Sequence, residues 1–344
     1  MYKFLVRPLL FLFAPETIHF IVSCILKVTF IIPGLSYIIS RLFTLENKRL
    51  VRDVAGLKFK NPVGLAAGFD KNASLFNELS NLGFSFVEIG TITPEPQTGN
   101  KRPRSFRLAK DSALINRMGF NNYGIEEIVR RLKRKRCDII IGGNIGKNTK
   151  TTNKDAYNDY EICFRKIYDH VDYIAVNVSC PNIDNLTELQ DAKALENILH
   201  RLMEIRKKQT KHKPVFLKIS PDLSNRQLDE IIDISVNTGI NGIIATNTTI
   251  ERKELRTSQD KIDKIGSGGL SGKPLTNRST ATIKYINKKL DGKLPIIGVG
   301  GIMSPEDAIE KIEAGATLVQ VYTGFIYEGP YLVKRINKAI AKAY

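Results

Sequence analysis

The chain has 344 residues, enough for one large hydrophobic core and an appendage. Hydrophobic residues make up 42% and charged residues 25%, a globular composition that excludes a disordered chain. The formal net charge of +17 favours acidic partners, such as anionic lipid, nucleic acid, or small carboxylates and phosphates, without selecting among them.

Residues 1–45 are apolar, with a few polar interruptions at Lys3, Arg7, Glu16, His19 and Lys27. A secretory signal would need a small-residue cleavage site after the first apolar run, where Ala14-Pro15-Glu16 stands instead. A spanning helix needs about 20 unbroken apolar residues. Lys27 and Pro33 interrupt the run between Phe20 and Ile39. We favour two short amphipathic helices, broken near Pro15 and Pro33 and lying in a lipid interface, over a spanning helix or a packed cap.

After Leu57, short apolar runs flanked by glycine alternate with longer helical patterns, such as Leu195–Lys207 and Gln227–Asn237. The expected strands are Val63–Ala67, Ser85–Gly90, Ile139–Asn144, Tyr173–Val178, Val215–Ile219, Gly242–Thr246, Pro295–Val299 and Leu318–Tyr322. Continuous apolar strands separated by helices indicate a parallel sheet buried on both faces. Eight such units predict an α/β fold, a closed (β/α)8 TIM barrel, with an open doubly wound sheet as the alternative.

Polar residues and glycines stand at the ends of these runs: Asp70, Lys71, Thr91, Asn144, Asn177, Cys180, Lys218, Thr246, Asn247, Thr248, Gly300, Gly301, Tyr322 and Thr323. In a barrel these positions meet at the C-terminal mouth, where barrel enzymes carry their chemistry. A set drawn from all eight strands is difficult to explain by packing alone. We therefore expect an active site at this mouth.

Two glycine motifs close the last two strands, Val299-Gly300-Gly301 and Tyr322-Thr323-Gly324. Backbone N–H groups at these positions can hold a phosphate, although each motif alone is also typical of a tight turn. Because the two motifs follow paired strands, we favour a phosphate site.

Carboxamides form a second group, in the loop Asn116–Asn122 and at Asn144, Asn177, Asn182 and Asn247. Such side chains offer donors and acceptors that could read a planar imide ring such as a pyrimidine, although a single Asn is more often a turn residue. Lys71 could pair with a substrate carboxylate, and Lys218 could stabilise negative charge on a reduced flavin.

Three further features of the sequence bear on nucleic-acid binding, redox compartment and metal binding. The basic run Arg130–Arg136 falls on a predicted helix, and we read it as a solvated face rather than a nucleic-acid site. The cysteines Cys24, Cys137, Cys163 and Cys180 form no C-x-x-C pair, which favours a reducing compartment over a disulfide framework. No His/Cys cluster has metal-ligand spacing, so we expect no metal.

Motifs along nearly the whole chain resemble the dihydroorotate dehydrogenase family. They are Ala67–Lys71, Asn116–Asn122, Asn144–Asn148, Asn177–Asn182, Lys218–Asp222, Ala245–Thr249, Gly269–Gly272 and Gly298–Gly301. The N-terminal appendage resembles the helical extension of the quinone-linked, class 2 members. This resemblance implies oxidation of (S)-dihydroorotate to orotate in de novo pyrimidine biosynthesis, with electrons passing through one FMN to ubiquinone or menaquinone.

The resemblance also implies site residues. FMN would be held by Ala67, Gly68, Phe69, Asp70, Lys71, Thr91, Asn144, Asn177, Lys218, Thr246, Gly272, Gly301, Tyr322 and Thr323. Dihydroorotate would be bound by Lys71, Asn116, Arg117, Met118, Gly119, Phe120, Asn177, Asn182, Asn247 and Thr248. Cys180 would be the base that removes the C5 proton. His19, Arg107 and Tyr322 would line a quinone tunnel between the N-terminal helices and the barrel mouth.

Two positions depart from the quinone-linked pattern, Cys180 where Ser is usual and Ile183 where Thr is usual. Cys is what the soluble class 1 enzymes carry as base, so this departure bears on the identity of the base, its pH dependence and any proton relay. We expect residues 1–45 to form the membrane and quinone-access extension and residues 46–344 the FMN-binding barrel. The absence of an Arg/Ser-rich transit segment favours a bacterial inner membrane over a mitochondrion. We expect peripheral association with the cytoplasmic side of that membrane.

Three alternatives remain open. A soluble class 1 enzyme would reduce fumarate or NAD, although residues 1–45 argue against it. An RNA-modifying flavin barrel, such as a tRNA dihydrouridine synthase, would suit the positive charge but would leave the amide set unexplained. A non-catalytic phosphate-binding barrel would hold no flavin.

Overall fold

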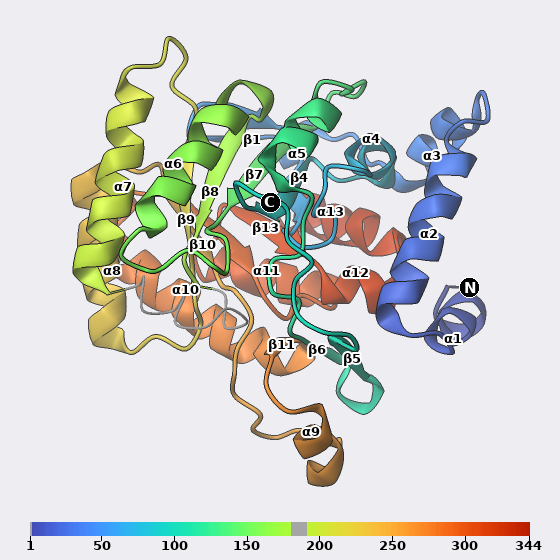
Figure 1. Cartoon of the computed structure of the whole chain (residues 1–344). Coiled ribbons are helices and arrows are strands. Elements are labelled where there is room, and N and C mark those ends of the chain that lie inside the picture. Colours follow the sequence, from blue (N-terminus) through green and yellow to red (C-terminus); the bar gives the residue numbers. More distant parts are fainter. Residues whose placement is uncertain (1, 180–190) are drawn as a thin grey trace.

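The computed structural model describes residues 2–179 and 191–344. Its centre is a closed barrel of eight parallel strands, in which the last strand pairs with the first (Figure 1). In barrel order these are β3 (Val63–Leu65), β4 (Phe86–Ile92), β7 (Ile140–Ile145), β8 (Tyr173–Asn177), β9 (Val215–Ile219), β10 (Gly242–Ala245), β12 (Ile296–Val299) and β13 (Leu318–Val321). The predicted TIM barrel is therefore confirmed, and the open doubly wound sheet is wrong.

Helices cover the outside of the barrel. They are α4 (Phe76–Leu79), α5 (Gly124–Leu132), α6 (Ala156–Ile167), α7 (Ala192–Lys207), α8 (Asn225–Thr238), α10 (Thr276–Leu290), α11 (Pro305–Glu313), α12 (Thr323–Glu328) and α13 (Tyr331–Ala343). The predicted helices Leu195–Lys207 and Gln227–Asn237 lie within α7 and α8. The local sequence accounts for both ends of α8. Ser224 and Gln227 form a capping box at its start, and Gly239 at φ 74° ends it.

Two hydrophobic layers hold this architecture together. One fills the space between the strands and the surrounding helices. The other lies inside the barrel, where Phe86 contacts Phe59 and Tyr173 edge-to-face at 5.2 and 6.4 Å between ring centroids. Phe59 belongs to a hairpin of β1 (Arg52–Val54) and β2 (Leu57–Phe59) that precedes the barrel. A packed interior at this end leaves the opposite, C-terminal end for chemistry.

A second sheet, not predicted from the sequence, extends from the C-terminal mouth. It is antiparallel, in the order β11 (Gly269–Gly272), β6 (Ala113–Asn116), β5 (Ser105–Leu108). Helix α9 (Gln259–Ile265) lies beyond it and packs Ile262 and Ile265 against this sheet (Figure 1). The sheet holds the amide-rich loop after β6 in place at the mouth.

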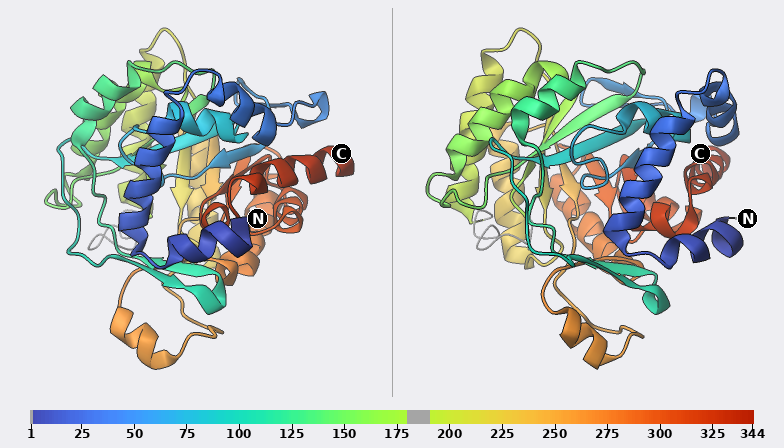
Figure 2. Two further views of the ribbon diagram at one scale, coloured as in Figure 1. Left: turned by 90° about the vertical axis from the view of Figure 1, so that its right-hand side faces the viewer. Right: turned by 45° about the vertical axis from the view of Figure 1, so that its right-hand side comes forward.

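The N-terminal segment is helical and lies beside α12 and α13 (Figures 1 and 2). It consists of a π-helical turn (Tyr2–Val6), α1 (Arg7–Phe11), α2 (Pro15–Thr29) and α3 (Leu35–Phe43). The predicted breaks near Pro15 and Pro33 are confirmed, but they separate three helical segments rather than two. Contacts attach the segment to the barrel: Tyr2 Oη donates to the Ile326 carbonyl at 2.7 Å, and Lys334 Nζ donates to the Leu42 carbonyl at 2.8 Å.

Within the described residues, no single helix is long and apolar enough to cross a membrane. Tyr2–Phe11 and Pro15–Thr29 have the length and composition together, but they bend by 119° at their junction.

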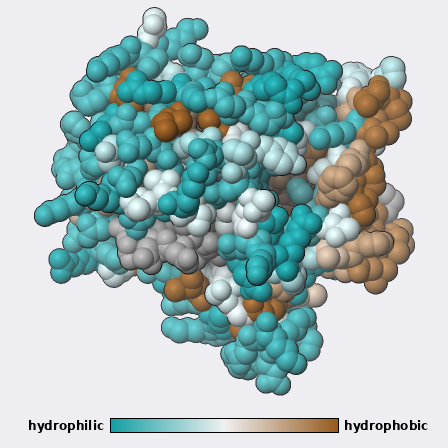
Figure 3. All heavy atoms as spheres, in the orientation of Figure 1, coloured by the Kyte–Doolittle hydropathy of each residue, from teal (hydrophilic) through white to brown (hydrophobic). Residues whose placement is uncertain are grey.

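The N-terminal helices carry a large exposed apolar surface. Figure 3 shows apolar side chains gathered over α1–α3 at one end of the molecule. This surface, here called the apolar face, comprises Phe4, Leu5, Leu9, Leu12, Phe13, Phe20, Ile25, Val28, Ile31, Ile32, Tyr37, Ile38 and Leu42. A contiguous apolar patch of this kind marks an interaction site.

The basic run is only partly helical. Helix α5 ends at Leu132, so the prediction that the whole run lies on a helix is wrong for Lys133–Arg136. Arg130 and Arg131 both pair with Glu127 at 2.7 Å on the surface.

Candidate active site

A cavity of about 740 Å³ connects the C-terminal mouth of the barrel with the N-terminal helices. It brings together most of the predicted site residues, from segments throughout the chain. Those that line it are His19, Ala67, Gly68, Phe69, Asp70, Lys71, Thr91, Arg107, Asn116, Met118, Gly119, Phe120, Asn177, Lys218, Thr246, Asn247, Thr248, Gly272, Gly301, Tyr322 and Thr323. Cys180 and Asn182 lie outside the described residues, as does Ile183.

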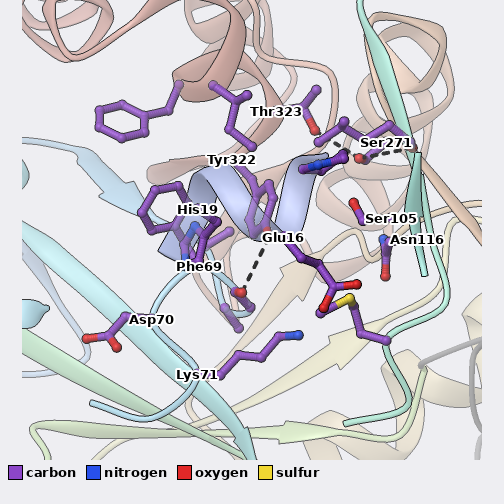
Figure 4. Close-up of a pocket in the computed structure, with 18 of the residues that line it drawn as sticks. Glu16, His19, Phe69, Asp70, Lys71, Ser105, Asn116, Ser271, Tyr322 and Thr323 are labelled. Carbon is purple, nitrogen blue, oxygen red and sulfur yellow. Dashed lines mark hydrogen bonds between the residues drawn. The ribbon is translucent and has the colours of Figure 1, made fainter. Parts of the chain in front are cut away.

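One corner of the cavity is built from glycine backbone. Gly272 and Gly301 have φ of +98° and +74°, a region that disfavours side chains. A Cβ on Gly301 would lie 2.4 Å from the backbone nitrogen of Thr276, and one on Gly272 would lie 2.4 Å from the Ser112 carbonyl oxygen. Thr323 contributes its hydroxyl, 2.8 Å from Ser271 Oγ (Figure 4). A close-approaching backbone beside hydroxyl groups suits a phosphate.

A network of buried side chains forms the floor. Thr91 Oγ1 donates to Asn144 Oδ1 at 2.6 Å, and Asn177 Nδ2 donates to Thr91 Oγ1 at 2.9 Å. Asn247 Nδ2 donates to Ser179 Oγ at 3.1 Å. Asn144 is fully buried and lies behind the lining rather than in it. These contacts fix the direction of each amide, so that the site presents a set pattern of donors and acceptors.

The floor extends inward to residues that we did not predict. Glu88, Tyr173 and Gln320 are buried inside the barrel, and the Glu88 carboxylate contacts Lys218 Nζ at 3.3 Å. Their sequence signal was a polar residue interrupting an apolar strand.

The loops beside the floor place cationic and amide groups over the cavity. Figure 4 shows Lys71 and Asn116 directed into the same space. Lys71 Nζ donates to Asn121 Oδ1 at 2.6 Å, which holds the ammonium toward the Asn116–Asn122 loop. An ammonium beside amides suits an anionic ring substrate.

Two predicted residues have their side chains engaged elsewhere. The Asp70 carboxylate accepts the backbone N–H groups of Ser74 and Leu75 at 2.7 and 2.8 Å, and burial raises its pKa. Arg117 donates to the Ser267 carbonyl at 3.0 Å and is not among the lining residues. Asp70 therefore lines the cavity with its carboxylate held by its own loop, whereas the Arg117 side chain is directed to the segment at Ser267.

An aromatic path leads from the floor toward the N-terminal helices. Phe69 contacts His19 and Tyr322 edge-to-face, with ring centroids 4.9 and 5.8 Å apart (Figure 4). Tyr322 donates its hydroxyl to the Gly68 carbonyl at 3.3 Å, and burial raises its pKa to about 12. Burial, followed by the nearby Lys71 charge, lowers the pKa of His19. A neutral imidazole therefore faces the path at neutral pH.

Two arginines join this end of the cavity to the appendage. Arg107 Nη1 donates to the Phe13 carbonyl at 2.5 Å, and its guanidinium lies 4.4 Å from the centre of the Phe11 ring. Arg104 Nε donates to Glu16 Oε2 at 2.9 Å, which ties α2 to the second sheet. The N-terminal helices thus form a wall of the cavity.

The chemistry available at this site involves amides, lysines and glycine backbone. Across residues 2–179 and 191–344, no group of three or more His, Cys, Asp and Glu side chains is placed to hold a metal. The fold and the site define an enzyme of the (β/α)8-barrel class with its catalytic mouth partly walled by an N-terminal helical segment.

Comparison with known proteins shows to which family within this class the chain is similar. A family model described as dihydroorotate dehydrogenase matches residues 49–343. A dihydroorotate dehydrogenase (quinone) from Christiangramia forsetii is 54% identical over 340 residues, covering 99% of this chain and 98% of that protein. One of the same name from Cellvibrio japonicus is 48% identical over 293 residues, covering 84% and 85%.

The fold agrees with these relatives. A crystal structure of the Eimeria tenella dihydroorotate dehydrogenase in complex with ferulenol superposes with a TM-score of 0.83 at 35% identity, covering 95% of this chain and 90% of that one. The chain belongs to the dihydroorotate dehydrogenase family.

Proposed function

We propose that this chain oxidises (S)-dihydroorotate to orotate in pyrimidine biosynthesis, using FMN as its flavin and a membrane quinone, ubiquinone or menaquinone, as electron acceptor. The observation that carries the proposal is the single cavity of about 740 Å³ that is lined both by the barrel mouth and by the N-terminal helices. One cavity of this kind gives a ring substrate and an apolar acceptor access to the same cofactor. The quinone-linked relatives support the same reaction.

The residues present fit FMN. The phosphate would be held at the glycine corner, where positive φ and close contacts with the Ser112 and Thr276 backbone restrict Gly272 and Gly301 to glycine. The isoalloxazine ring would be held by Ala67, Gly68, Thr91, Asn177 and Lys218, all of which line the cavity. Bound flavin supplies a two-electron acceptor for the C6 hydride and a donor for the quinone. We propose the full predicted set of FMN residues, with Asn144 shaping the site from behind the cavity lining.

The substrate is proposed to lie between the flavin and the amide loop. Lys71 pairs with the orotate carboxylate, while Asn116, Asn177 and Asn247 read the ring, and Met118, Gly119, Phe120 and Thr248 complete the pocket. Asn182 joins this set and Cys180 is the base for the C5 proton, although both lie outside the described residues.

The acceptor is proposed to enter along the aromatic path past His19, Arg107 and Tyr322. Phe20 belongs both to the cavity lining and to the apolar face, and such a face suits insertion into the lipid that dissolves the quinone. We therefore assign residues 1–45 to membrane and quinone access and residues 46–344 to the barrel. The proposed location is the cytoplasmic side of a bacterial inner membrane, with peripheral attachment.

The test is anaerobic stopped-flow mixing of the purified, flavin-loaded protein with dihydroorotate, followed by a soluble quinone. We expect dihydroorotate to bleach the flavin and the quinone to restore its colour. Bleaching followed by reoxidation with fumarate or NAD instead would assign the soluble class 1 reaction. A colourless protein that gains no flavin from added FMN would refute the proposal. In a parallel test, high salt should not fully release the protein from anionic vesicles, because apolar insertion resists salt.

A further inference from the structure

Glu88 is a fully buried carboxylate that the function above leaves unexplained. It lies on β4, inside the barrel, with 0% exposure. Asn144 Nδ2 donates to its Oε1 at 2.8 Å, and Lys218 Nζ lies 3.3 Å from the same oxygen. Gln320 Nε2 and Tyr173 Oη donate to its Oε2 at 2.8 and 3.1 Å. Donors from four other strands, β7, β9, β13 and β8, thus converge on one side chain.

Two of these donors belong to the cavity itself. Lys218 and Gln320 line it, whereas Glu88 does not. Asn144 connects indirectly, because its Oδ1 accepts from Thr91 Oγ1 at 2.6 Å and from Asn177 Nδ2 at 3.2 Å, and both of those residues line the cavity. Glu88 therefore stands one layer behind the proposed flavin floor and contacts it at several points.

The energetics do not favour a purely structural role. A buried ion pair costs desolvation energy that its attraction barely repays, and well-packed apolar residues often serve stability better. The arrangement does have a precise effect on the floor. The carboxylate accepts a hydrogen bond from the Asn144 amide N–H, which directs the Asn144 carbonyl oxygen toward Thr91 and Asn177. It also sets one negative charge beside the Lys218 ammonium.

We propose that Glu88 is a positioning residue that sets the reduction potential of the bound flavin by partly neutralising Lys218 and by fixing the Asn144 amide. The proposal rests on the proposed function, since it requires FMN over Lys218. Reduction adds negative charge to the flavin, and a nearby carboxylate opposes that charge. Glu88 therefore keeps the potential lower than Lys218 alone would set it, which favours passing electrons onward to an acceptor.

The experiment measures the midpoint potential of bound FMN by equilibration with reference dyes, together with the dissociation constant of oxidised FMN. Glu88→Gln keeps the shape and removes the charge. We expect reduced FMN to be stabilised relative to oxidised FMN by at least tenfold, a rise of about 30 mV for a two-electron couple. The control Tyr173→Phe removes one hydrogen bond to Glu88 without removing charge, and should leave the potential near the wild-type value.

Other outcomes are equally informative. Weaker binding of both redox states by the same factor, with an unchanged potential, would mean that Glu88 only supports the fold, and would overturn the proposal. If Glu88→Gln does not fold, Glu88→Asp retains the charge but withdraws it by one methylene. A rise in potential then supports the proposal, and no change overturns it. Failure of dihydroorotate to bleach the wild-type flavin would instead refute the proposed function.

Discussion

Gly301, at the end of β12, offers a direct test of the proposed phosphate corner. Its φ is +74°, and a Cβ there would lie 2.4 Å from the backbone nitrogen and Cα of Thr276. Thr276 begins α10 and donates its hydroxyl to the Gly301 carbonyl at 2.7 Å. Because the obstructing atoms are backbone, Gly301→Ala must move either the glycine loop or the start of α10.

The chain supplies a matched control at Gly239. That glycine also has φ of +74°, but a Cβ there would meet nothing within 4 Å. Gly239→Ala therefore measures only the strain of a left-handed alanine, about 1–2 kcal/mol. Gly301→Ala has the same strain plus overpacking of about 1–3 kcal/mol, so we expect its free energy of unfolding to fall by about 2–5 kcal/mol.

The decisive measurement is FMN affinity. Displacing the corner should break one or two hydrogen bonds to a charged phosphate, each contributing about 1.5–3 kcal/mol, and should weaken FMN binding by roughly 10–10⁴-fold. Urea unfolding reports stability, and quenching of flavin fluorescence on titration into flavin-stripped protein reports affinity. Equal FMN affinity in Gly301→Ala and Gly239→Ala would place the phosphate elsewhere.

Three further tests address the tunnel, the base and a buried lysine. Val22 lies on the cavity side of α2, so Val22→Trp should slow reoxidation of the flavin by quinone but not its bleaching by dihydroorotate. Val28 lies on the exposed side of α2, so Val28→Trp should change neither rate. Equal rates of reoxidation in the two variants would refute the tunnel. Cys180→Ala should bind FMN and orotate normally but reduce its flavin roughly 10²–10⁴-fold more slowly in stopped flow, and wild-type bleaching would mean that the base is elsewhere. Burial lowers the pKa of Lys311 from 10.5 to about 8, so the unfolded chain binds more protons between these pH values. The stability of the wild type relative to Lys311→Met should therefore rise between pH 8 and pH 10, by at most about 3 kcal/mol in denaturant titrations, and a pH-independent difference would contradict this.

The barrel was predictable because each strand is buried on both faces and therefore appears as a short, continuous apolar run. Val215–Ile219 agrees to the residue, and the other strands differ from the prediction by one or two positions at one or both ends. The second sheet was not predictable in this way. It pairs Ala113 with Gly272, far apart in the chain, and Gly269–Gly272 has little strand propensity of its own.

The structure of the N-terminal segment could be predicted from the sequence only in part. Proline cannot continue a helix, so the breaks near Pro15 and Pro33 could be placed. The residues that tie the helices to the barrel could not be found, because Tyr2, Lys3 and Lys334 are ordinary polar residues until the fold brings their partners close. Lys3, for example, pairs with Glu328 at 2.7 Å.

The buried network around Glu88 could not be predicted from the sequence. Polar residues at strand ends share one edge in any parallel barrel, so their convergence follows from topology alone. Glu88, Tyr173 and Gln320 lie within strands, and a strand residue can face either the barrel interior or the helices. Which way it faces, and at what height, depends on the tilt and stagger with which all eight strands close. Burying a single charge inside an apolar run such as Phe86–Ile92 costs free energy unless the charge is paired. The sequence therefore indicates that Glu88 has buried partners. Only the closed barrel identifies those partners, and here they include the lysine proposed to face the flavin.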